Sequence, residues 1–337
     1  MPALLILTVK NEASFLVEWL AHHLTCGFDH VLAFSNDCSD GTDLMLDSLQ
    51  DRGHVTHVRN AGPHAEGPQW AALKAADKHP LVKSADWILF CDVDEFVNIH
   101  TGDHTLPALW QTVPQADAFA LTWRLFGNAG VVAYQDRPVT ETFTRAAPAT
   151  LGWPWRAQMF KTLFRNNGAF RKLGVHRPRN QDPDRTALWV DGSGRAIPPH
   201  SRLFSDYRQD NYQLVQLNHY ALGAMESYLV KCDRGRANRE AQAFDLGYWI
   251  ERNLSDVVDT SISALDSTAL REDLLADPVI GPLHLKAVRW RRDRFAALMA
   301  EEPWRALFGR LLMSRPSRTL SNDQAALIQA HVQRSAD

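Results

Sequence analysis

Apolar runs and helical repeats alternate along the first hundred residues of the chain. Short, continuous apolar runs predict strands that are buried on both faces of a sheet, and they lie at residues 4–9, 31–34, 55–58 and 87–91. Apolar residues at helical spacing predict helices between these strands, at residues 12–25, 44–50 and 69–76. This alternation predicts an α/β fold with a mainly parallel central sheet and helices on both faces.

The later part of the chain has a different pattern. Strand-like runs recur at residues 118–125, 159–165 and 213–217, with loops rich in Gly, Pro and Asp between them. From about residue 221 the apolar spacing becomes helical, and it predicts helices at residues 224–244, 282–301 and 321–334. We therefore expect one domain over residues 1–222 and a C-terminal helical region over residues 223–337.

Polar clusters follow three of the predicted strands at the point where each strand ends. They are Lys10-Asn11-Glu12, the segment from Asn36 to Asp43, and the segment from Asp92 to Glu95. Ligands of open α/β sheets bind outside the carboxyl ends of the strands. Segments that are distant in sequence are therefore expected to meet at one edge of the sheet and to form a binding site there.

The fourth predicted strand runs directly into acidic residues, in the segment WILFCDVDEFVNI at residues 87–99. On an extended chain Asp92 and Asp94 would point to the same side, and two carboxylates at the edge of a core repel one another. A hard cation such as Mn²⁺ or Mg²⁺ would relieve this repulsion and leave positions for water and phosphate oxygens. The alternative is a solvated strand end that carries surface acids.

Composition limits the possible partners. The 337 residues carry a formal net charge of −3, which gives no general attraction to nucleic acid or to an anionic membrane. The segment KAVRWRRDR at residues 286–294 is locally basic; it would either touch a membrane or a lipid-linked acceptor, or form the solvated face of a helix. No apolar run is long enough for a transmembrane helix, and the four cysteines form no CxxC pair, so we expect a reduced, cytoplasmic protein.

Taken in order, the motifs resemble family 2-type glycosyltransferases of the GT-A fold, in the bacterial branch that carries DVDEF. They are KNE (10–12), SNDCSDGT (35–42), DVDEF (92–96), WRLFGNAG (123–130), KTLFR (161–165), GVHRP (174–178) and LNHYALGAMESYLVKCDRG (217–235). The resemblance implies metal-dependent transfer of a sugar, with inversion, from a nucleotide-diphosphate donor to an acceptor hydroxyl of a glycan or lipid-linked molecule. The pathway implied is polysaccharide or glycoconjugate synthesis.

The resemblance also implies roles for individual residues. Direct metal binding would fall to Asp94, with Asp92 on the metal or the ribose, Glu95 behind them, and His219 or its competitor His176 as a further contact. The contacts to nucleotide and diphosphate would be made by Thr8, Lys10, Asn11, Glu12, Asn36, Asp40, Gln69, Lys231, Arg234 and Arg236. Cys38 departs from the family pattern, in which Ser is usual, and Asp40 has the alternative role of a turn or capping residue.

The catalytic base is the least defined part of this prediction. An inverting transferase needs a carboxylate that takes the acceptor proton, and Glu141 and Asp191 are the acids that we expect in this role. Aromatic side chains that would line an acceptor site are Trp123, with Arg124 beside it, and Trp153, Trp155 and Trp189.

Two other classes of protein remain open at this point. A metal-dependent nucleotidyltransferase or pyrophosphatase can be built on a similar sheet, although no GxxxxGK phosphate loop is present. A non-catalytic carbohydrate- or protein-binding module on a transferase-like core is the other alternative, and the intact acidic motif disfavours it.

Overall fold

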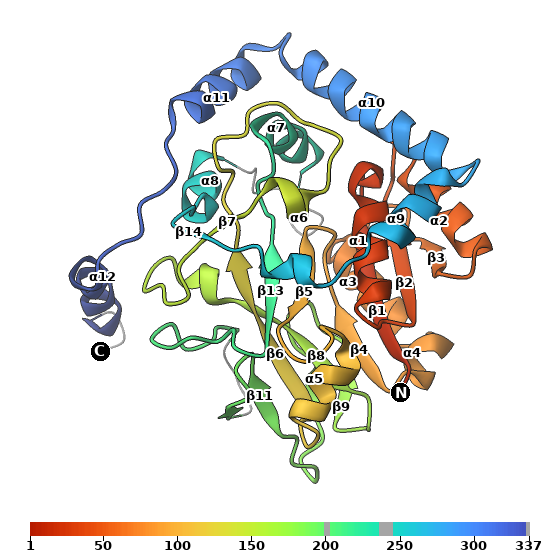
Figure 1. The fold of residues 1–337 in the computed structure, drawn as a ribbon, viewed down its shortest axis with the longest axis vertical. Helices are drawn as coiled ribbons and strands as arrows, with labels where there is room; N and C mark the ends of the chain where they lie inside the picture. Colours follow the sequence, from red (N-terminus) through yellow and green to blue (C-terminus); the bar gives the residue numbers. More distant parts are fainter. Residues whose placement is uncertain (199–202, 236–244, 335–337) are drawn as a thin grey trace.

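The computed structural model describes residues 1–198, 203–235 and 245–334 (Figure 1). Its largest sheet has the strand order β12-β11-β6-β8-β4-β1-β2-β3. The bounds of these strands are β1 Ala3–Val9, β2 His30–Ser35, β3 Val55–Arg59, β4 Trp87–Phe90, β6 Ala118–Leu125, β8 Phe160–Arg165, β11 Trp189–Asp191 and β12 Ala196–Ile197. Strands β1, β2, β3 and β4 are parallel to their neighbours in this set, β11 is parallel to β6, and β8 is antiparallel to β4 and β6. The predicted α/β fold with a mainly parallel sheet is confirmed.

Helices cover both faces of this sheet because strand residues point alternately to either side. Leu5 and Leu7 of β1 join an apolar cluster with helices α1 and α2, whereas Leu4 and Ile6 join a second cluster with helix α3. The helices of this half are α1 Ala13–Thr25, α2 Thr42–Asp51, α3 Pro68–Ala76, α4 Pro80–Ser84, α5 Leu106–Thr112 and α6 Val139–Thr142. The continuous apolar run in the sequence thus reflects burial on two faces.

A smaller set of strands branches from β6 and passes close to the acidic motif. Strand β13 (Val215–His219) pairs in parallel with β6 and antiparallel with β5 (Glu95–Ile99), and this register places His219 opposite Glu95. The remaining short strands are β7 Arg145–Ala146, β9 Phe170–Lys172, β10 Arg179–Gln181 and β14 Val257–Val258. The pairing of β13 with β5 brings the end of one strand to the start of another that lies far away in sequence.

The C-terminal region is helical, as predicted. Its helices are α7 Met225–Arg234, α8 Leu246–Arg252, α9 Thr268–Ala276, α10 Ile280–Leu298, α11 Glu302–Met313 and α12 Asn322–Arg334. The expected helix at residues 224–244 corresponds to α7 at its start, and residues 236–244, with Arg236, lie outside the described residues. None of the helices in the described segments is long and apolar enough to cross a membrane.

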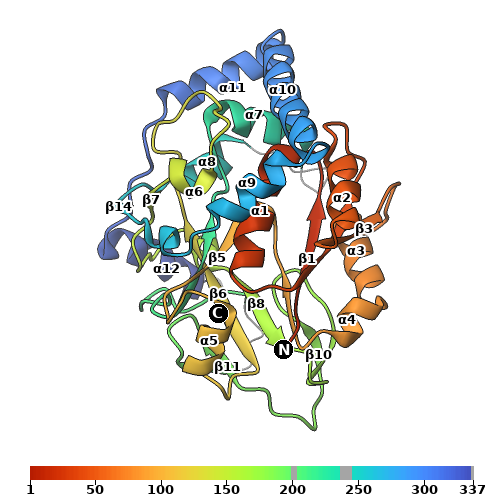
Figure 2. The ribbon, with the colours of Figure 1, turned by 45° about the vertical axis from the view of Figure 1, so that its right-hand side comes forward.

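This helical region packs directly on the first half of the chain. Figure 2 shows α9 and α10 lying over α1 and beside α2, and Leu274, Ile280, Ala287 and Val288 belong to the same apolar cluster as β1 and α1. Near residue 222 the secondary structure thus changes to helices, and these helices pack closely against the first part of the chain.

Candidate active site

A cavity of about 580 Å³ lies where the ends of β1, β4 and β13 meet helices α3 and α7, a size typical of small-molecule sites. Many residues expected in the site line it together. They are Thr8, Lys10, Glu12, Gln69, Asp92, Asp94, Trp123, His176, His219, Lys231 and Arg234. The expected convergence of distant polar segments at one edge of the sheet is thus present in the structure.

The acidic motif forms a turn between β4 and β5, with Val93 and Asp94 at its centre. The backbone N–H of Asp92 donates to Oε2 of Glu95 at 2.9 Å, and the N–H of Glu95 donates to the carbonyl oxygen of Asp92 at 3.0 Å. The expectation of an extended strand at Asp92 and Asp94 is therefore wrong, although both side chains line the large cavity. The turn gives each acid a different set of neighbours.

Each of the two aspartates faces a lysine from a distant segment. Nζ of Lys161, a fully buried residue of β8, lies 2.9 Å from Oδ2 of Asp92 and 3.5 Å from Oε2 of Glu95. Nζ of Lys231, on α7, lies 2.6 Å from Oδ2 of Asp94 and also donates to the carbonyl oxygen of Ala221. Sequence reasoning missed Lys161, although a lysine inside the apolar run FKTLFR is a signal of a buried charge pair.

These ion pairs determine which groups are charged. Burial opposes the charge of Asp94, but the ammonium of Lys231 and the imidazole of His219 outweigh it and hold the pKa of Asp94 well below its usual range. Burial alone would lower the pKa of Lys161, yet Asp92 and Glu95 raise it above its usual value. Glu95 differs from Asp94, because burial raises its pKa to about 8 in spite of the nearby Lys161. Asp94 and Lys161 are thus fully charged at neutral pH.

Helix α1 binds the backbone of the acidic turn and of β5. Nε1 of Trp19 donates to the carbonyl oxygens of Asp92 and Glu95, at 3.1 and 2.9 Å. His22 contacts the carbonyl oxygen of Val97 at 2.7 Å through Nε2, and Nε2 of His23 accepts the N–H of Val97 at 3.3 Å. The segment EWLAHH therefore positions the acidic turn by binding the backbone of β5, a role that sequence reasoning did not foresee.

Two histidines face the cavity beside Trp123. Nε2 of His219 lies 3.7 Å from Oδ2 of Asp94, and its buried Nδ1 has no hydrogen-bond partner among the described residues. The Trp123 ring lies 4.3 Å from the His219 ring and 5.7 Å from the His176 ring, between centroids, and Nε1 of Trp123 donates to Oε1 of Glu95 at 2.7 Å. Burial lowers the pKa of both histidines, that of His176 to about 4, so both rings are neutral at pH 7.

These residues fit a divalent cation. Asp94 offers a charged carboxylate, and His219 offers a neutral imidazole close to it, which are ligand types that Mn²⁺ accepts. Within residues 1–198, 203–235 and 245–334 no cluster of three or more His, Cys, Asp or Glu side chains is arranged to hold a metal ion. A cation here would take its other ligands from water and from phosphate oxygens, as is usual for Mg²⁺ bound with nucleotides.

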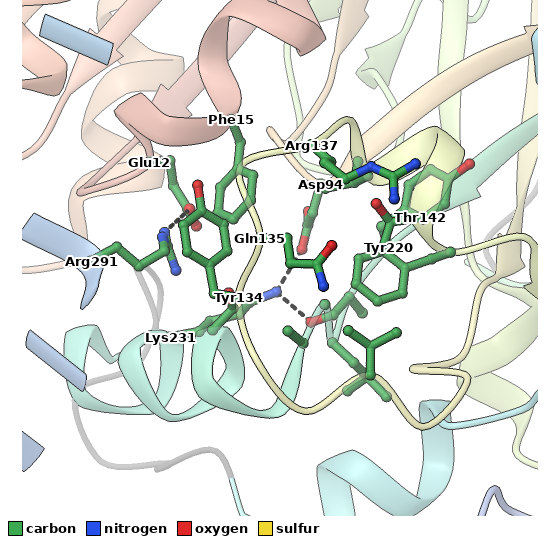
Figure 3. Close-up of a pocket in the computed structure, with 18 of the residues that line it drawn as sticks. Glu12, Phe15, Asp94, Tyr134, Gln135, Arg137, Thr142, Tyr220, Lys231 and Arg291 are labelled. Atoms are coloured by element: carbon green, nitrogen blue, oxygen red, sulfur yellow. Dashed lines mark hydrogen bonds and ion pairs between the residues drawn. The ribbon is translucent and has the colours of Figure 1, made fainter. Parts of the chain in front are cut away.

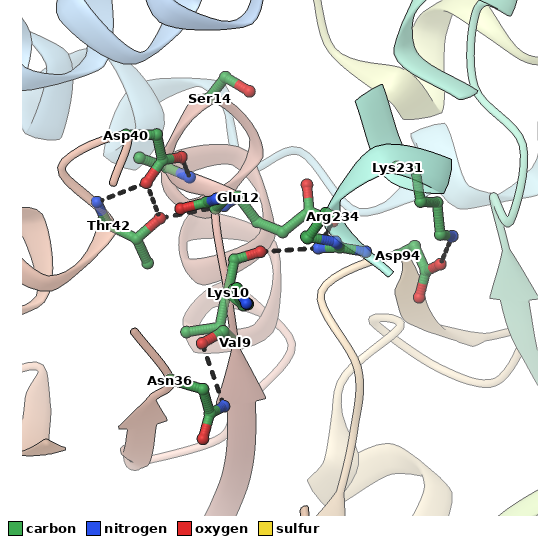
Figure 4. A network of polar contacts seen from close by, with 12 residues as sticks. Val9, Lys10, Glu12, Ser14, Asn36, Asp40, Thr42, Asp94, Lys231 and Arg234 are labelled. Carbon is green, nitrogen blue, oxygen red and sulfur yellow. Dashed lines mark hydrogen bonds and ion pairs between the residues drawn. The ribbon is translucent and has the colours of Figure 1, made fainter. Parts of the chain in front are cut away.

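Other predicted contacts support the loops around the cavity instead of lining it (Figure 4). Asp40 is buried and accepts hydrogen bonds from the backbone N–H of Ala13 and from the N–H and hydroxyl of Thr42. Asn36 donates to the carbonyl oxygen of Val9, and Asn11 accepts the N–H of Ser39. The structure therefore gives Asp40 the alternative role of a turn and capping residue.

Gln69 and Glu12 both line the large cavity, but they have different hydrogen-bond partners. Nε2 of Gln69 is 3.5 Å from Oδ1 of Asp92, and its buried Oε1 has no hydrogen-bond partner among the described residues. Glu12 binds the Arg234 guanidinium, which also donates to the carbonyl oxygen of Lys10 at 2.8 Å. Both arrangements aim polar groups at the space where a ligand would lie.

The two expected catalytic acids lie elsewhere. Asp191, on β11, is buried and accepts hydrogen bonds from the N–H groups of Ser193 and Arg195 and from the Arg195 side chain. Glu141 is exposed on α6, and neither acid lines the cavity. Asp191 stabilises the turn that follows β11, because its carboxylate accepts these hydrogen bonds from residues of that turn.

The expected acceptor residues are divided in the same way. Trp123 lines the cavity, whereas Arg124 points to the Tyr212 ring, 5.0 Å from its centroid. Trp153 and Trp155 pack against each other, and Trp189 packs on Phe170. Of this group, the structure brings Trp123 to the acidic turn.

A second, smaller cavity is also lined by Asp94 and Lys231 (Figure 3). Its volume is about 60 Å³, which is room for a few water molecules. Phe15, Tyr134 and Tyr220 are among its walls, and the N–H of Tyr134 donates to Glu226. A cavity of this size does not admit a sugar, so the larger cavity is the candidate active site.

Comparisons with known proteins support the interpretation of this chain as a glycosyltransferase. Residues 7–221 match the model of glycosyltransferase family 92. A family 92 protein of rice (Oryza sativa subsp. japonica) is 24% identical over 143 residues, which cover 40% of this chain and 23% of the relative. A family 92 protein of Ricinus communis is 29% identical over 97 residues, which cover 28% of this chain and 16% of the relative. The chain thus spans less than a quarter of the length of these plant relatives.

Solved structures show a more distant likeness. The crystal structure of residues 1–349 of TarS from S. aureus has a TM-score of 0.29 and 19% identity, and the match covers 49% of this chain and 47% of that fragment. Glucosyl-3-phosphoglycerate synthase from Mycobacterium tuberculosis, solved with Mn²⁺ and uridine diphosphate, has a TM-score of 0.25 and 15% identity, with coverage of 36% and 44%. These scores are too low to transfer any residue role. The match to the family model, which covers well over half of the sequence, shows that this chain belongs to glycosyltransferase family 92.

Proposed function

We propose that this family 92 chain transfers a sugar from a nucleotide-diphosphate donor to an acceptor hydroxyl, with the help of Mn²⁺ or Mg²⁺. The observation that carries the proposal is the meeting of Asp94, His219 and Lys231 on one cavity. Acid, imidazole and ammonium there surround a space that suits a cation and a diphosphate together. The family 2-type inverting mechanism and a place in polysaccharide or glycoconjugate synthesis are part of the same proposal.

In this mechanism Asp94 and His219 would hold the cation, and Asp92 would contact it or the ribose. The cation supplies charge stabilisation for the leaving diphosphate. Lys231 and Arg234 add positive charge from α7 on the same cavity, and charge-assisted contacts of this kind are stronger than neutral hydrogen bonds. Thr8, Lys10 and Gln69 lie on the same walls, where they would bind the nucleotide.

Inversion by direct displacement requires that the acceptor hydroxyl lose its proton as it attacks the sugar. We propose that a carboxylate of the large cavity takes this proton, because Glu141 and Asp191 do not reach it. Trp123 is positioned to pack against a sugar ring, since its indole is held by Glu95 next to the acidic turn.

Calorimetric titration with UDP and GDP, with and without Mn²⁺, tests the proposal. We expect metal-dependent binding by the wild-type protein and at least about tenfold weaker binding by Asp94→Asn, since metal ligands and their immediate partners commonly contribute this much. Asp182→Asn is the matched control, because Asp182 pairs with Arg171 on the protein surface. Equal affinity of wild type and Asp94→Asn would contradict the proposed metal site.

The same samples distinguish the two rival classes. A panel of sugar nucleotides, read by release of nucleoside diphosphate, should identify the donor of a glycosyltransferase. Release of pyrophosphate from a nucleoside triphosphate would instead identify a nucleotidyltransferase or pyrophosphatase. Binding of glycan without any metal-dependent nucleotide affinity would identify a non-catalytic module.

A further inference from the structure

The basic segment at residues 286–294 lies on α10 and contains one arginine that differs from its neighbours. Arg291 is 4% exposed, whereas Arg289 and Arg292 are exposed to solvent. Burying a guanidinium is costly unless it is paired. The placement of Arg291 therefore requires an explanation that a solvated helix face does not give.

Arg291 binds the junction between the loop that follows β1 and helix α1. Its Nη2 lies 3.0 Å from Oε2 of Glu12, and its Nε donates to the hydroxyl of Ser14 at 3.0 Å. Its guanidinium carbon is 4.4 Å from the centroid of the Phe15 ring and 5.7 Å from that of Tyr134. Figure 3 shows Arg291 pointing at Glu12, with the Phe15 and Tyr134 rings close by. The guanidinium thus has a carboxylate, a hydroxyl and aromatic rings as neighbours.

Glu12 joins this buried arginine to the proposed donor site. Its other oxygen, Oε1, binds Nη1 of Arg234, which lines the large cavity. One carboxylate therefore lies between two guanidinium groups, and the trio carries one positive charge in excess. That excess charge faces the cavity through Arg234, where the diphosphate of a donor would lie.

We propose that Arg291 is a positioning residue of the donor site. It fixes the carboxylate of Glu12, and Glu12 in turn holds Arg234 against the cavity wall. Helix α10, which lies beyond the residues matched by the family model, thereby completes the diphosphate site. This inference rests on the proposed function, because it assigns the cavity to a nucleotide diphosphate.

Binding of UDP in the presence of Mn²⁺ by the full chain tests the inference. Arg291→Gln should bind UDP about tenfold more weakly, because Arg234 loses its fixed partner. Arg291→Lys, which keeps the charge and loses the fork geometry, should fall between wild type and Arg291→Gln. Arg289→Gln removes the same charge from an exposed position of the same helix, and it should bind like wild type.

A double variant shows whether Arg291 acts through Glu12. In a Glu12→Gln background, Arg291→Gln should cause little further loss of UDP affinity, since the partner through which it acts is gone. A merely structural role would lower the melting temperature and leave the affinity of the folded protein unchanged. Circular dichroism, recorded well below the melting temperature, identifies the variants that are folded.

Each result decides between defined outcomes. Wild-type affinity for UDP in Arg291→Gln overturns the inference and leaves the proposed function intact. The same conclusion follows if Arg291→Gln lowers the UDP affinity by the same factor in the wild-type and the Glu12→Gln backgrounds. If Arg291→Gln does not fold, wild-type affinity in Arg291→Lys overturns the inference in the same way. A wild-type protein that binds no nucleoside diphosphate contradicts the proposed function itself, and the inference with it.

Discussion

Nζ of Lys231 lies 2.6 Å from Oδ2 of Asp94, although 137 positions separate the two residues in sequence. Burial by itself would favour the protonated acid, but this contact and that of His219 outweigh it and hold the pKa of Asp94 low. Asp94 is therefore ionised, and available to a cation, across the neutral and mildly acidic pH range.

Replacement of Lys231 by Met should change how metal-dependent UDP binding depends on pH. In the wild-type protein the affinity should stay nearly constant as the pH falls from 8 to 6, because the depressed pKa of Asp94 lies below this window. In Lys231→Met burial is opposed less, because the contribution of Lys231 is gone and that of His219 remains. The pKa of Asp94 should therefore rise, and the affinity should begin to fall at a higher pH. Calorimetric titration at several pH values measures both curves.

The slope of UDP affinity against pH separates this effect from the simple loss of a positive charge near the diphosphate. That loss alone would weaken binding equally at every pH. Lys83→Met, at an exposed position, should keep the wild-type profile. Parallel curves for wild type and Lys231→Met would contradict the assigned coupling between Lys231 and Asp94.

Trp19→Phe should destabilise the protein by about 2 kcal/mol, because the carbonyl oxygens of Asp92 and Glu95 each lose a hydrogen-bond donor. Urea unfolding followed by circular dichroism measures the change in the free energy of unfolding. Trp155→Phe is the control, since Trp155 is 38% exposed, and it should unfold nearly as the wild-type protein does. A Trp19→Phe protein as stable as the control would show that the indole does not hold the acidic turn.

The unfolding free energy should fall as the pH falls through the range from about 6.5 to about 4. Burial lowers the pKa of His22 to about 4 and that of His23 well below its ordinary value, so both rings stay neutral in the folded protein. The unfolded chain takes up protons on both histidines below pH 6.5, which stabilises the unfolded state. Each histidine should contribute a slope of up to about 1.4 kcal/mol per pH unit.

Urea unfolding at pH 7.0, 6.0 and 5.0 measures this slope, and His23→Gln should reduce it. Burial raises the pKa of Glu95 and Glu18 in the folded protein, so these acids act against the histidines in this window. Both acids are retained in His23→Gln, so a difference from wild type near pH 6 reports on the histidine. An identical slope in both proteins would contradict the assignment.

Glu141→Gln and Asp191→Asn should both retain sugar-transfer turnover close to wild type, because neither side chain lines the large cavity. Asp191→Asn should nevertheless lower the melting temperature, since it weakens the charge-assisted contact with Arg195. Initial rates with saturating donor and acceptor provide the comparison. A loss of turnover by a factor of about 100 in either variant, with the fold intact, would restore that acid as the candidate base.

Much of the fold follows from local patterns in the sequence. The alternating apolar runs and helical repeats predict the parallel strands β1 to β4 and the helices between them, because burial on two faces requires continuous apolar strands. The positions of polar clusters after these strands also predict the edge of the sheet at which the cavity lies. For this reason the placement of Lys10, Glu12, Asp92 and Asp94 on the cavity could be predicted from the sequence alone.

Only the tertiary structure decided how these groups are paired. Lys161 meets Asp92 because β8 inserts antiparallel beside β4, and His219 meets Asp94 because β13 pairs with β5. The turn at residues 92–94 depends on contacts from α1, and the burial of Arg291 depends on the packing of α10 over that helix. Periodicity reports the environment of a residue along its own segment, whereas ion pairs between distant segments depend on strand order and helix packing, which no local pattern specifies.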